Sequence, residues 1–342
     1  MGLDLKPLIN AKSIKLEELS NKIIAVDAYN AIYQFLAIIR GQQGEYLTDH
    51  SGNVTSHLSG LFYRSINLLS LNIKLVYIFD GVAPSLKTLE IERRKKIKHE
   101  AVIKYQEALR EGRIEDAKRY AQMTSMIKDY MINDAKRLLD YLAIPWINAP
   151  SEGEATAAHL TRSIVYASAS QDYDSLLFGA AKLVRNITIS GRRKLPMKNI
   201  YIDVEPELIV LDDLLRSLDI TREMLVDIGI LIGTDFNPDG FKGIGAKKAL
   251  KLIKEYGRLE DIPLEDVKET LKETDYQTIR EIFLKPNVED VKELKFGEPD
   301  YDAIINFLCK EHDFSYERVN TALNKLRESR SKSSESLEKW FA

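Results

Sequence analysis

Short apolar runs that end in an acidic residue recur along this chain. The run 23–26 is followed directly by Asp27, and the run 75–79 by Asp80. Continuous apolar runs of this length, separated by longer helix-like segments, are typical of strands buried on both faces of a parallel sheet. Such folds place their functional sites at the carboxyl ends of the strands. The chain is therefore predicted to be an α/β protein whose site contains these acids.

The order of the expected elements supports a mostly parallel central sheet flanked by helices on both faces. Strands that alternate with helices of ordinary length indicate parallel pairing through helical crossovers. Beyond residue 232 the sequence looks helical. Strands are expected at 22–27, 74–80, 163–169, 181–188 and 199–203, and helices at 28–40, 55–72, 123–142, 151–162 and 205–232.

Seven carboxylates in apolar or glycine-turn settings form the candidate site. They are Asp27, Asp80, Glu152, Glu154, Asp172, Asp174 and Asp235. Taken singly, each has another interpretation as a helix cap, a first-turn residue or a turn former. Taken together, converging anions repel one another unless cations lie between them. Oxygen ligands without His or Cys partners suit Mg²⁺ or Mn²⁺ rather than zinc, so the pattern predicts a magnesium enzyme.

The segment 87–119 interrupts the alternation directly after the strand that ends at Asp80. It is dense in basic residues such as Lys95, with acids such as Glu90 and Glu92 interleaved. A charge run of this kind is commonly a solvated helical pair. Its position beside a candidate metal site favours a second interpretation, a basic helical lid that grips a phosphodiester backbone.

A glycine hairpin, Gly243-Ile244-Gly245, is the second candidate functional element. Glycines let a backbone pass close to a phosphate, and the amides at the start of the next helix point toward it. Lys247 and Lys248 add positive charge to that helix. A plain tight turn is the alternative, but the lysines favour a helix–hairpin–helix that contacts the DNA backbone without reading sequence.

Composition narrows the location and class of the protein. The 342 residues, 44% of them apolar, suffice for one large domain or two smaller ones. The single cysteine, Cys309, excludes an internal disulfide and fits a reducing compartment. No apolar run is long enough for a bilayer and no secretory signal is recognisable, so we expect an intracellular protein, cytoplasmic or at the nucleoid in a prokaryote and nuclear in a eukaryote. His57 and His159 stand at no metal-ligand spacing and are interpreted as structural.

Several stretches together resemble the structure-specific 5′ nucleases, and among them the flap endonucleases of the archaeal and eukaryotic type. The resemblance covers nearly the whole chain and implies a PIN-like 5′ nuclease core with a helical arch and a C-terminal helix-hairpin DNA-binding region. The stretches that carry it are Val26-Asp27-Ala28, Tyr33-Gln34-Phe35, Thr55-Ser56-His57-Leu58, Phe62-Tyr63-Arg64, Tyr77-Ile78-Phe79-Asp80-Gly81, Pro150-Ser151-Glu152-Gly153-Glu154-Ala155, 167–174, Gly233-Thr234-Asp235-Phe236 and Gly243-Ile244-Gly245.

The resemblance implies that the seven acids hold two Mg²⁺ ions, for which Mn²⁺ substitutes. Asp27, Asp80, Glu152 and Glu154 lie around one ion in this picture, and Asp172, Asp174 and Asp235 around the other. Two metals roughly 4 Å apart activate a water and stabilise the leaving oxygen of a phosphoryl displacement. The family also places a Lys and an Arg at the foot of the arch, and the spacing after Asp80 puts them at Lys87 and Arg94, facing the scissile phosphate.

Further DNA contacts follow from the same resemblance. Tyr33 is expected to stack on a base near the cut, although a core tyrosine is an equally good interpretation. Gly2 resembles the processed N-terminus beside the site, and a monovalent cation is expected at the glycine hairpin. The remaining positions are expected to contact the DNA backbone (Arg40, Arg64, Arg185) or to form a pocket for a one-nucleotide 3′ flap (Leu47, Thr55, Phe314, Arg318), where His312 replaces the family's usual Lys.

The C-terminal segment resembles a sliding-clamp (PCNA) peptide. Leu337, Trp340 and Phe341 fit its apolar anchors, whereas Ser334 stands where the family has Gln. The expected organisation is a single nuclease domain followed by a flexible tail. The nuclease domain spans 1–326 and the tail spans 327–342. Within the domain lie an N-terminal region 1–98, the arch 85–122 and an internal region 123–258 that contains the hairpin 233–258.

The function implied is a 5′ flap endonuclease with associated 5′-3′ exonuclease activity, acting near single-strand/double-strand junctions in DNA replication, including Okazaki fragment maturation, and in repair. A monomer is expected. A 5′ exonuclease or junction resolvase of the same superfamily is the near alternative. A non-catalytic junction-binding protein recruited to the clamp needs the hairpin and tail but not the acids. A small-substrate phosphatase needs the acids but leaves the arch and hairpin unexplained.

Overall fold

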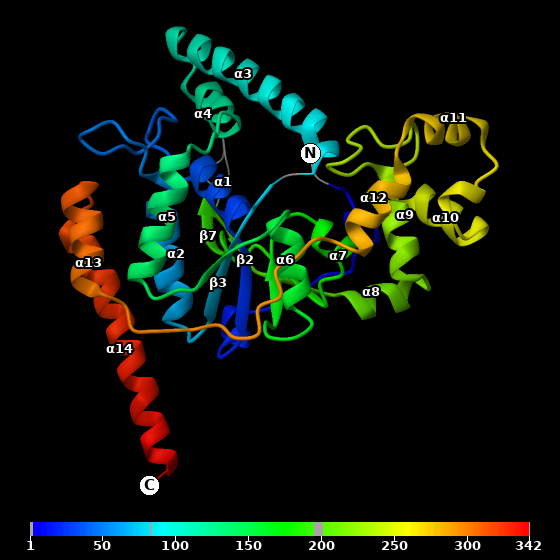
Figure 1. Cartoon of the computed structure of the whole chain (residues 1–342). Helices are drawn as coiled ribbons and strands as arrows, with labels where there is room; N and C mark the ends of the chain where they lie inside the picture. The colour runs from blue at the N-terminus through cyan, green and yellow to red at the C-terminus, as the bar shows by residue number, and fades with distance from the viewer. Residues whose placement is uncertain (1–2, 83, 195–200, 342) are drawn as a thin grey trace.

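The computed structural model describes residues 3–82, 84–194 and 201–341, and for Leu89, 192–194, 201–202 and 332–341 it describes the backbone only. A seven-stranded sheet runs through the centre of this described part (Figure 1). In spatial order its strands are β1 (Lys12–Ser13), β9 (Glu207–Val210), β6 (Lys182–Arg185), β5 (Ala167–Ala169), β2 (Ile23–Asp27), β3 (Lys74–Phe79) and β4 (Trp146–Asn148).

The pairing places the carboxyl ends of the inner strands along one edge. β2 pairs in parallel with both β3 and β5, β4 adds in parallel to β3, and β6 adds in parallel to β5. Only β9 runs in the opposite direction, because it pairs antiparallel with both β6 and β1 at one side of the sheet. The predicted mostly parallel α/β sheet is confirmed. Asp27 is registered with Ile78 of β3, so the acids that end these two strands are neighbours.

Both faces of the sheet are covered, which explains the uninterrupted apolar runs. In β2, Ile24 and Val26 join one core cluster while Ala25 joins another on the opposite face. The larger cluster includes residues of α1 (Ala28–Ile38), α2 (Ser56–Leu69) and α5 (Asp129–Tyr141), and the smaller one lies against α6 (Gly153–Leu160). Successive side chains of a strand point to opposite faces, so a strand buried on both sides must be apolar throughout.

A pair of helices, α3 (Thr88–Arg110) and α4 (Ile114–Met123), stands above the carboxyl edge of the sheet (Figure 1). They pack against each other along small residues, with Ala101 and Ala108 of α3 and Ala117 and Ala121 of α4 all buried. Most other side chains of α3 are exposed, as its charge density requires. The segment is therefore a helical pair, and its base leads directly from β3 through a 3₁₀ turn, Ser85–Lys87.

A second helical core lies to the other side of the sheet and includes the N-terminal residues Leu3 and Leu5. Three elements lie beside α2 and α5 instead: α13 (Tyr301–Ile305), a π-helical turn (Asn306–Glu311) and α14 (Tyr316–Phe341). No helix in the described ranges has the length and apolar character that crossing a membrane requires. The helices of the second core are α7 (Asp174–Leu177), α8 (Leu211–Leu218), α9 (Arg222–Ile232), α10 (Ala246–Tyr256), α11 (Glu265–Glu273) and α12 (Tyr276–Leu284). The remaining 3₁₀ turns are Lys6–Leu8, Leu16–Leu19 and Leu259–Asp261.

Several details differ from the sequence expectations, and one is that the helix expected over 205–232 is divided into α8 and α9. The stretch 207–210, expected to be helical, is strand β9, because it pairs antiparallel with β6. The strand expected at 199–203 appears as β8 (Tyr201–Val204), paired with β7 (Gly191–Lys194) outside the central sheet, and 199–200 lie outside the described residues. The helix expected from residue 123 begins at Asp129. Finally, α14 continues as one helix to Phe341 where a flexible tail was expected from residue 327.

Candidate active site

The first two acids of the site are positioned by the ends of β2 and β3. Asp27 is the last residue of β2 and also the N-cap of α1, since its Oδ1 accepts the backbone N–H of Asn30 at 2.9 Å. Asp80 follows β3, and its Oδ1 accepts the backbone N–H of Gly153 at 2.7 Å. Asp27 can therefore cap α1 and also lie at the candidate site, because β2 ends where α1 begins.

Glycine at position 153 allows the start of α6 to approach this edge. A Cβ at Gly153 would lie 2.8 Å from Oδ1 of Asp80 and 3.2 Å from the carbonyl oxygen of Ile78, which is too close for any other residue without a shift. The approach brings Glu152, the N-cap position of α6, and Glu154, in its first turn, beside the strand ends.

The 170–174 turn adds two more acids, Asp172 and Asp174, to the site. Asp172 accepts a hydrogen bond from Nδ2 of Asn30 at 3.0 Å, and Glu154 accepts the backbone N–H of Ser175 at 3.1 Å. Asp174 opens the short helix α7 and is buried. Its Oδ1 has no hydrogen-bond partner among the described residues, although it is shielded from solvent. A buried carboxylate oxygen without a donor is costly unless a cation approaches it.

Two cations from the base of the arch reach the acids. Nζ of Lys87 lies 2.5 Å from Oε2 of Glu152 and 3.4 Å from Oδ2 of Asp235, which follows α9. Nη2 of Arg94 lies 2.5 Å from Oδ1 of Asp235. The arch therefore closes over the site through ion pairs between residues far apart in the sequence.

The electrostatics of the acids reflect crowding. Burial and the neighbouring charge of Asp80 raise the pKa of Asp27 to about 8. Burial, with repulsion from nearby acids, also raises the pKa of Glu154 and Asp174 well above their ordinary values, and the pKa values of Asp80, Glu152 and Asp172 are raised as well, first by burial. Burial alone would lower the pKa of Lys87, but Glu152 and Asp235 raise it above its ordinary value. Burial and mutual repulsion thus disfavour the ionised form of these acids, and nearby positive charge would favour it.

These observations test whether divalent cations fit the site. Six of the seven acids, all but Asp174, line one cavity of about 640 Å³, and the donors are oxygens only. In the described part of the chain no three His, Cys, Asp or Glu side chains already converge as a set of metal ligands. Two of the acids, Glu152 and Asp235, are held by Lys87 and Arg94 instead. The orphaned Asp174 oxygen and the raised carboxyl pKa values are those of a site that accepts added positive charge, so the residues fit Mg²⁺ or Mn²⁺.

Tyr33 lies at the wall of the same cavity rather than in the core. The residue is 37% exposed, which excludes the interpretation of a buried core tyrosine. The ammonium group of Lys98, from α3, lies 4.4 Å from the centre of its ring. An exposed aromatic ring between the arch and the acids is placed where a base could stack.

The glycine hairpin lies between α9 and α10, at the surface. Gly243 has φ +73°, a left-handed conformation that favours glycine, and a Cβ at either Gly243 or Gly245 would meet no atom within 4 Å. Gly245 is the N-cap residue of α10, and Lys247 and Lys248 are exposed on its first turn. The open space, the helix start and the lysines form the surface that a DNA backbone requires.

The three arginines expected at the DNA backbone are occupied by contacts within the protein. Arg40 donates to the carbonyl oxygens of Leu36 and Gly44 and stacks on Tyr46. Arg64 donates to the carbonyl oxygen of Ile187, and burial lowers its pKa to about 10.

Arg185 donates to the carbonyl oxygen of Gln171 at 3.1 Å and to the hydroxyl of Tyr173 at 2.5 Å, so it holds the turn that carries Asp172. Each of the three arginines supports the shape of the protein, and their contact with DNA stays a prediction. Gly2 lies outside the described residues, and the side chains of Leu337, Trp340 and Phe341 are not described.

Of the residues expected to form the 3′-flap pocket, Thr55 and Leu47 meet at the start of α2, where the backbone N–H of Thr55 donates to the carbonyl oxygen of Leu47 at 2.7 Å. Thr55 is buried before α2, Leu47 is 39% exposed, Phe314 is half-buried and Arg318 is exposed. Beside them, His312 lies between Asp49 and Asp134, with Nδ1 3.1 Å from Oδ2 of Asp49 and Nε2 3.9 Å from Oδ2 of Asp134.

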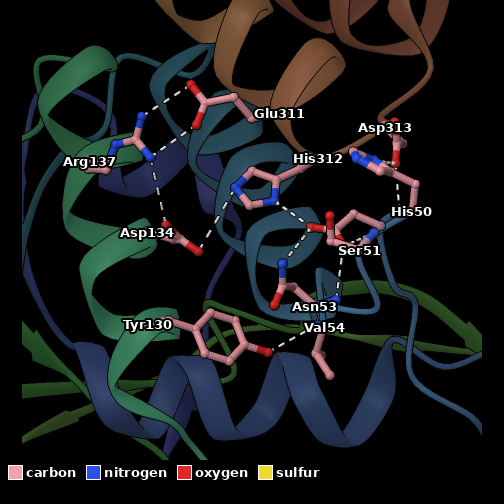
Figure 2. Close-up of polar contacts among 11 residues, drawn as sticks. His50, Ser51, Asn53, Val54, Tyr130, Asp134, Arg137, Glu311, His312 and Asp313 are labelled. Atoms are coloured by element: carbon pink, nitrogen blue, oxygen red, sulfur yellow. Dashed lines mark hydrogen bonds and ion pairs between the residues drawn. The ribbon is translucent and has the colours of Figure 1, made fainter.

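Figure 2 shows His312 wedged between α5 and the loop that carries Ser51 and Asn53. The next residue of each segment forms a second histidine–aspartate pair, with the histidine now on the loop. The backbone N–H of His50 donates to Oδ2 of Asp313 at 2.6 Å, and Nδ1 of His50 lies 2.6 Å from the same oxygen. Two consecutive residues of the loop thus pair with two consecutive residues before α14, and they join segments separated by 263 positions.

The Asp49 pair predicts an acid-dependent loss of stability. Burial would raise the pKa of Asp49, but hydrogen bonds from the Asn53 backbone, His312 and Ser51 outweigh it and lower the pKa. A lowered pKa means that these bonds stabilise the fold above the ordinary carboxyl pKa and are lost as the pH falls through the lowered value. Asp49→Asn is expected to be less stable than the wild type at neutral pH by about 1–3 kcal/mol and to lose less on acidification.

The measurement is the free energy of unfolding by urea, taken for both proteins from neutral pH down to the onset of acid unfolding. The two curves should converge as the pH falls. Parallel curves would show that the pKa of Asp49 does not differ between the folded and the unfolded protein. Asp212→Asn, a change of an exposed residue on α8, is the control and should follow the wild type throughout.

Two polar residues of the site escaped the sequence interpretation. Asn30 bridges the acids, because it donates to Asp172 while its Oδ1 accepts from Gln34 at 2.7 Å. The signal was the pair Asn30 and Gln34, four apart on a helix that is otherwise largely apolar. Glu90, at the base of the arch, bonds to Arg94 and is almost wholly buried. Its spacing from Arg94 was visible, but the arch contains so many charged pairs that none stood out.

Comparisons with known proteins agree with this geometry. The family described as the XPG N-terminal domain matches residues 3–101, and the XPG I-region matches residues 143–235. Flap endonuclease 1 of Nitrosopumilus maritimus is 58% identical to the chain and is covered completely, as is the chain. The solved structure of flap endonuclease-1 from Methanococcus jannaschii is 37% identical with a TM-score of 0.74, over 97% of this chain and 100% of that one. The catalytic core of Rad2 in complex with a DNA substrate is 26% identical with a TM-score of 0.68, over 94% and 97% of the two chains.

Proposed function

The chain belongs to the flap endonuclease family, as its motifs indicated, and from this premise we propose that its seven carboxylates bind two divalent cations at which flap DNA is cut. Relatives named flap endonuclease 1 match it from end to end, so the protein is a structure-specific flap endonuclease. The proposal adds the ions, their ligands and the roles of single residues. We take the ions to be Mg²⁺, with Mn²⁺ as a substitute.

One observation supports the proposal above all others. Acids from separate elements, among them Asp27, Glu152 and Asp235, line a single cavity beneath Lys87 and Arg94. Asp27, Asp80, Glu152 and Glu154 would hold one ion, and Asp172, Asp174 and Asp235 the other. When bound, the two ions would supply charge stabilisation and an activated water for phosphodiester hydrolysis.

The side chains of the protein contribute the remaining steps. Lys87 and Arg94 hold positive charge where the scissile phosphate enters, so they stabilise the negative charge that develops on its oxygens. Tyr33 offers its exposed ring to the base beside the cut. Lys95 and Lys98, which line the same cavity, attract the strand on its way past the arch. Lys247, Lys248 and the glycine hairpin grip the duplex, with a monovalent cation at the hairpin carbonyls.

The DNA substrate of this chain is a 5′ flap at a single-strand/double-strand junction, and the reaction belongs to replication and repair. The Rad2 core in complex with a DNA substrate supports a DNA ligand for this fold. We further propose an intracellular monomer that binds a sliding clamp through Leu337, Trp340 and Phe341. The sequence match of these three anchors supports the clamp as partner, and Ser334 in place of Gln predicts a weaker grip than the full peptide has.

The deciding experiment is cleavage of a double-flap duplex labelled at the 5′ end. We expect one main product with Mg²⁺ or Mn²⁺, no product with EDTA, and full recovery when Mg²⁺ is restored. Mg²⁺ should also raise the melting temperature at constant ionic strength, since a ligand at a hundred times its Kd stabilises the folded state by about 2.7 kcal/mol. Sodium chloride of equal ionic strength is the control.

Cleavage in EDTA would contradict the proposal. Tight junction binding without cleavage under any divalent ion would instead support the non-catalytic junction-binding alternative. Nicked duplexes and four-way junctions in the same assay separate a flap enzyme from a 5′ exonuclease or a resolvase, because a flap enzyme cuts the double flap fastest.

A further inference from the structure

Glu90 is an unusual residue for its place in the fold. It lies in the first turn of α3, a helix whose other charged side chains are mostly exposed, yet only 2% of its surface is exposed. A buried carboxylate is strongly unfavourable unless it is paired and hydrogen-bonded. A residue so unfavourable in isolation must make contacts that compensate for its burial.

Arg94 is one partner that compensates for the burial of Glu90. Oε1 of Glu90 accepts a hydrogen bond from Nε of Arg94 at 2.7 Å, one helical turn further on. Nη2 of the same guanidinium donates to Oδ1 of Asp235 at 2.5 Å, inside the candidate active site. A guanidinium is planar and rigid, so a bond at Nε determines where the Nη atoms point. An acid four residues before a base is also the favourable order on a helix.

We propose that Glu90 is a positioning residue that aims the Arg94 guanidinium at the reacting phosphate. The inference rests on the role proposed above for Arg94. Without Glu90, Arg94 would remain on the same helix and keep its charge, but its half-exposed side chain would be free to sample other rotamers. An arginine that moves freely must lose side-chain entropy again in each catalytic event. Misplaced electrostatic stabilisation lowers the rate of the chemical step rather than the affinity for DNA.

A purely structural role makes a different prediction. An acid in the first turn also interacts with the helix dipole, and its loss could loosen α3 as a whole. Such loosening would act on every residue of the arch and would slow cleavage whether or not Arg94 is present. A positioning role acts through Arg94 alone, so the effects of the two residues are coupled.

The test is a double-mutant cycle measured by single-turnover cleavage of the double-flap duplex at saturating enzyme. We expect Glu90→Ala to slow cleavage about tenfold, which is equivalent to about 1.4 kcal/mol at 25 °C, with substrate Kd unchanged. Glu90→Gln keeps a carbonyl acceptor for Nε and should recover part of the loss. In an Arg94→Ala background, Glu90→Ala should change the rate less than twofold.

Glu92→Ala is the matched control, because Glu92 is an exposed acid two residues further along the same helix. It removes the same charge and should cleave like the wild type. A second readout follows Arg94 itself. In a protein with ¹⁵N-labelled arginine, the Nε–H proton of Arg94 should exchange slowly with solvent in the wild type and rapidly in Glu90→Ala.

The outcomes separate the two claims. If Arg94→Ala cleaves at the wild-type rate, the proposed role of Arg94 is wrong and the positioning role falls with it. If Arg94→Ala is slow but Glu90→Ala loses the same factor in both backgrounds, only the positioning role is overturned. A wild-type rate for Glu90→Ala also overturns it, whatever Arg94 does.

Discussion

Asp172→Asn is expected to slow flap cleavage by roughly 10³-fold or more while leaving flap binding nearly unchanged. Asp172 is half-buried among the other acids, and burial together with the charge of Asp235 raises its pKa. The amide keeps the shape of the side chain and an acceptor for Asn30, so the fold should survive. It removes a charge that a divalent ion needs, and the loss of one such group in a preorganised site typically costs several powers of ten.

The measurement is single-turnover cleavage with excess Mg²⁺, accompanied by a binding titration of the same flap DNA. Asp212→Asn, on the exposed face of α8, is the matched control and should cleave normally. Binding should be equal or slightly tighter in Asp172→Asn, because one repulsive charge is gone. Turnover within tenfold of the wild type would show that Asp172 lies beside the metal centre without serving it.

Lys87→Ala has the second large effect, and it should move two quantities in opposite directions. Cleavage should fall roughly 10²–10³-fold, because a cation that stabilises the transition state is removed. The affinity for Mg²⁺ should rise, because Lys87 pairs with Glu152 and Asp235 and therefore competes with an added cation for both. A residue that only held the arch in place would weaken both properties together.

Isothermal titration with Mg²⁺ in the absence of DNA measures the second quantity. The metal-free Lys87→Ala protein should also melt at a lower temperature than the wild type, since its acids lose their internal counter-ion. Lys96→Ala is the matched control on the exposed side of α3 and should leave both values unchanged. Weaker Mg²⁺ binding in Lys87→Ala would contradict the competition.

Much of the fold and of the acid set was visible in the sequence because the two signals have local causes. Strands buried on both faces need unbroken apolar runs, and parallel strands bring their carboxyl ends to one edge. Asp27 and Asp80 could therefore be placed side by side from their positions in the runs. Strand β9 was missed because four residues paired antiparallel beside a parallel core carry no comparable pattern.

Other parts of the site depend on contacts between distant segments. The core interpretation of Tyr33 rested on an apolar helix, and the expected DNA contacts of Arg64 and Arg185 rested on the family resemblance. Only the surroundings of each residue decide whether a ring faces the cavity or a guanidinium is already bonded. The same holds for Asp49 and His312, which meet across 263 positions. No local pattern predicts such a meeting, because the intervening chain sets it.

The sequence by itself determined which side chains could bind divalent cations and DNA, since apolar period, acid placement and glycine turns act over a few residues. Only the tertiary structure decided which of those charged side chains pair with one another. Lys87 and Arg94 reach the acids from the arch, and a buried Glu90 orients one of them, because packing brings the charges within a few ångströms and electrostatic energy depends on that distance.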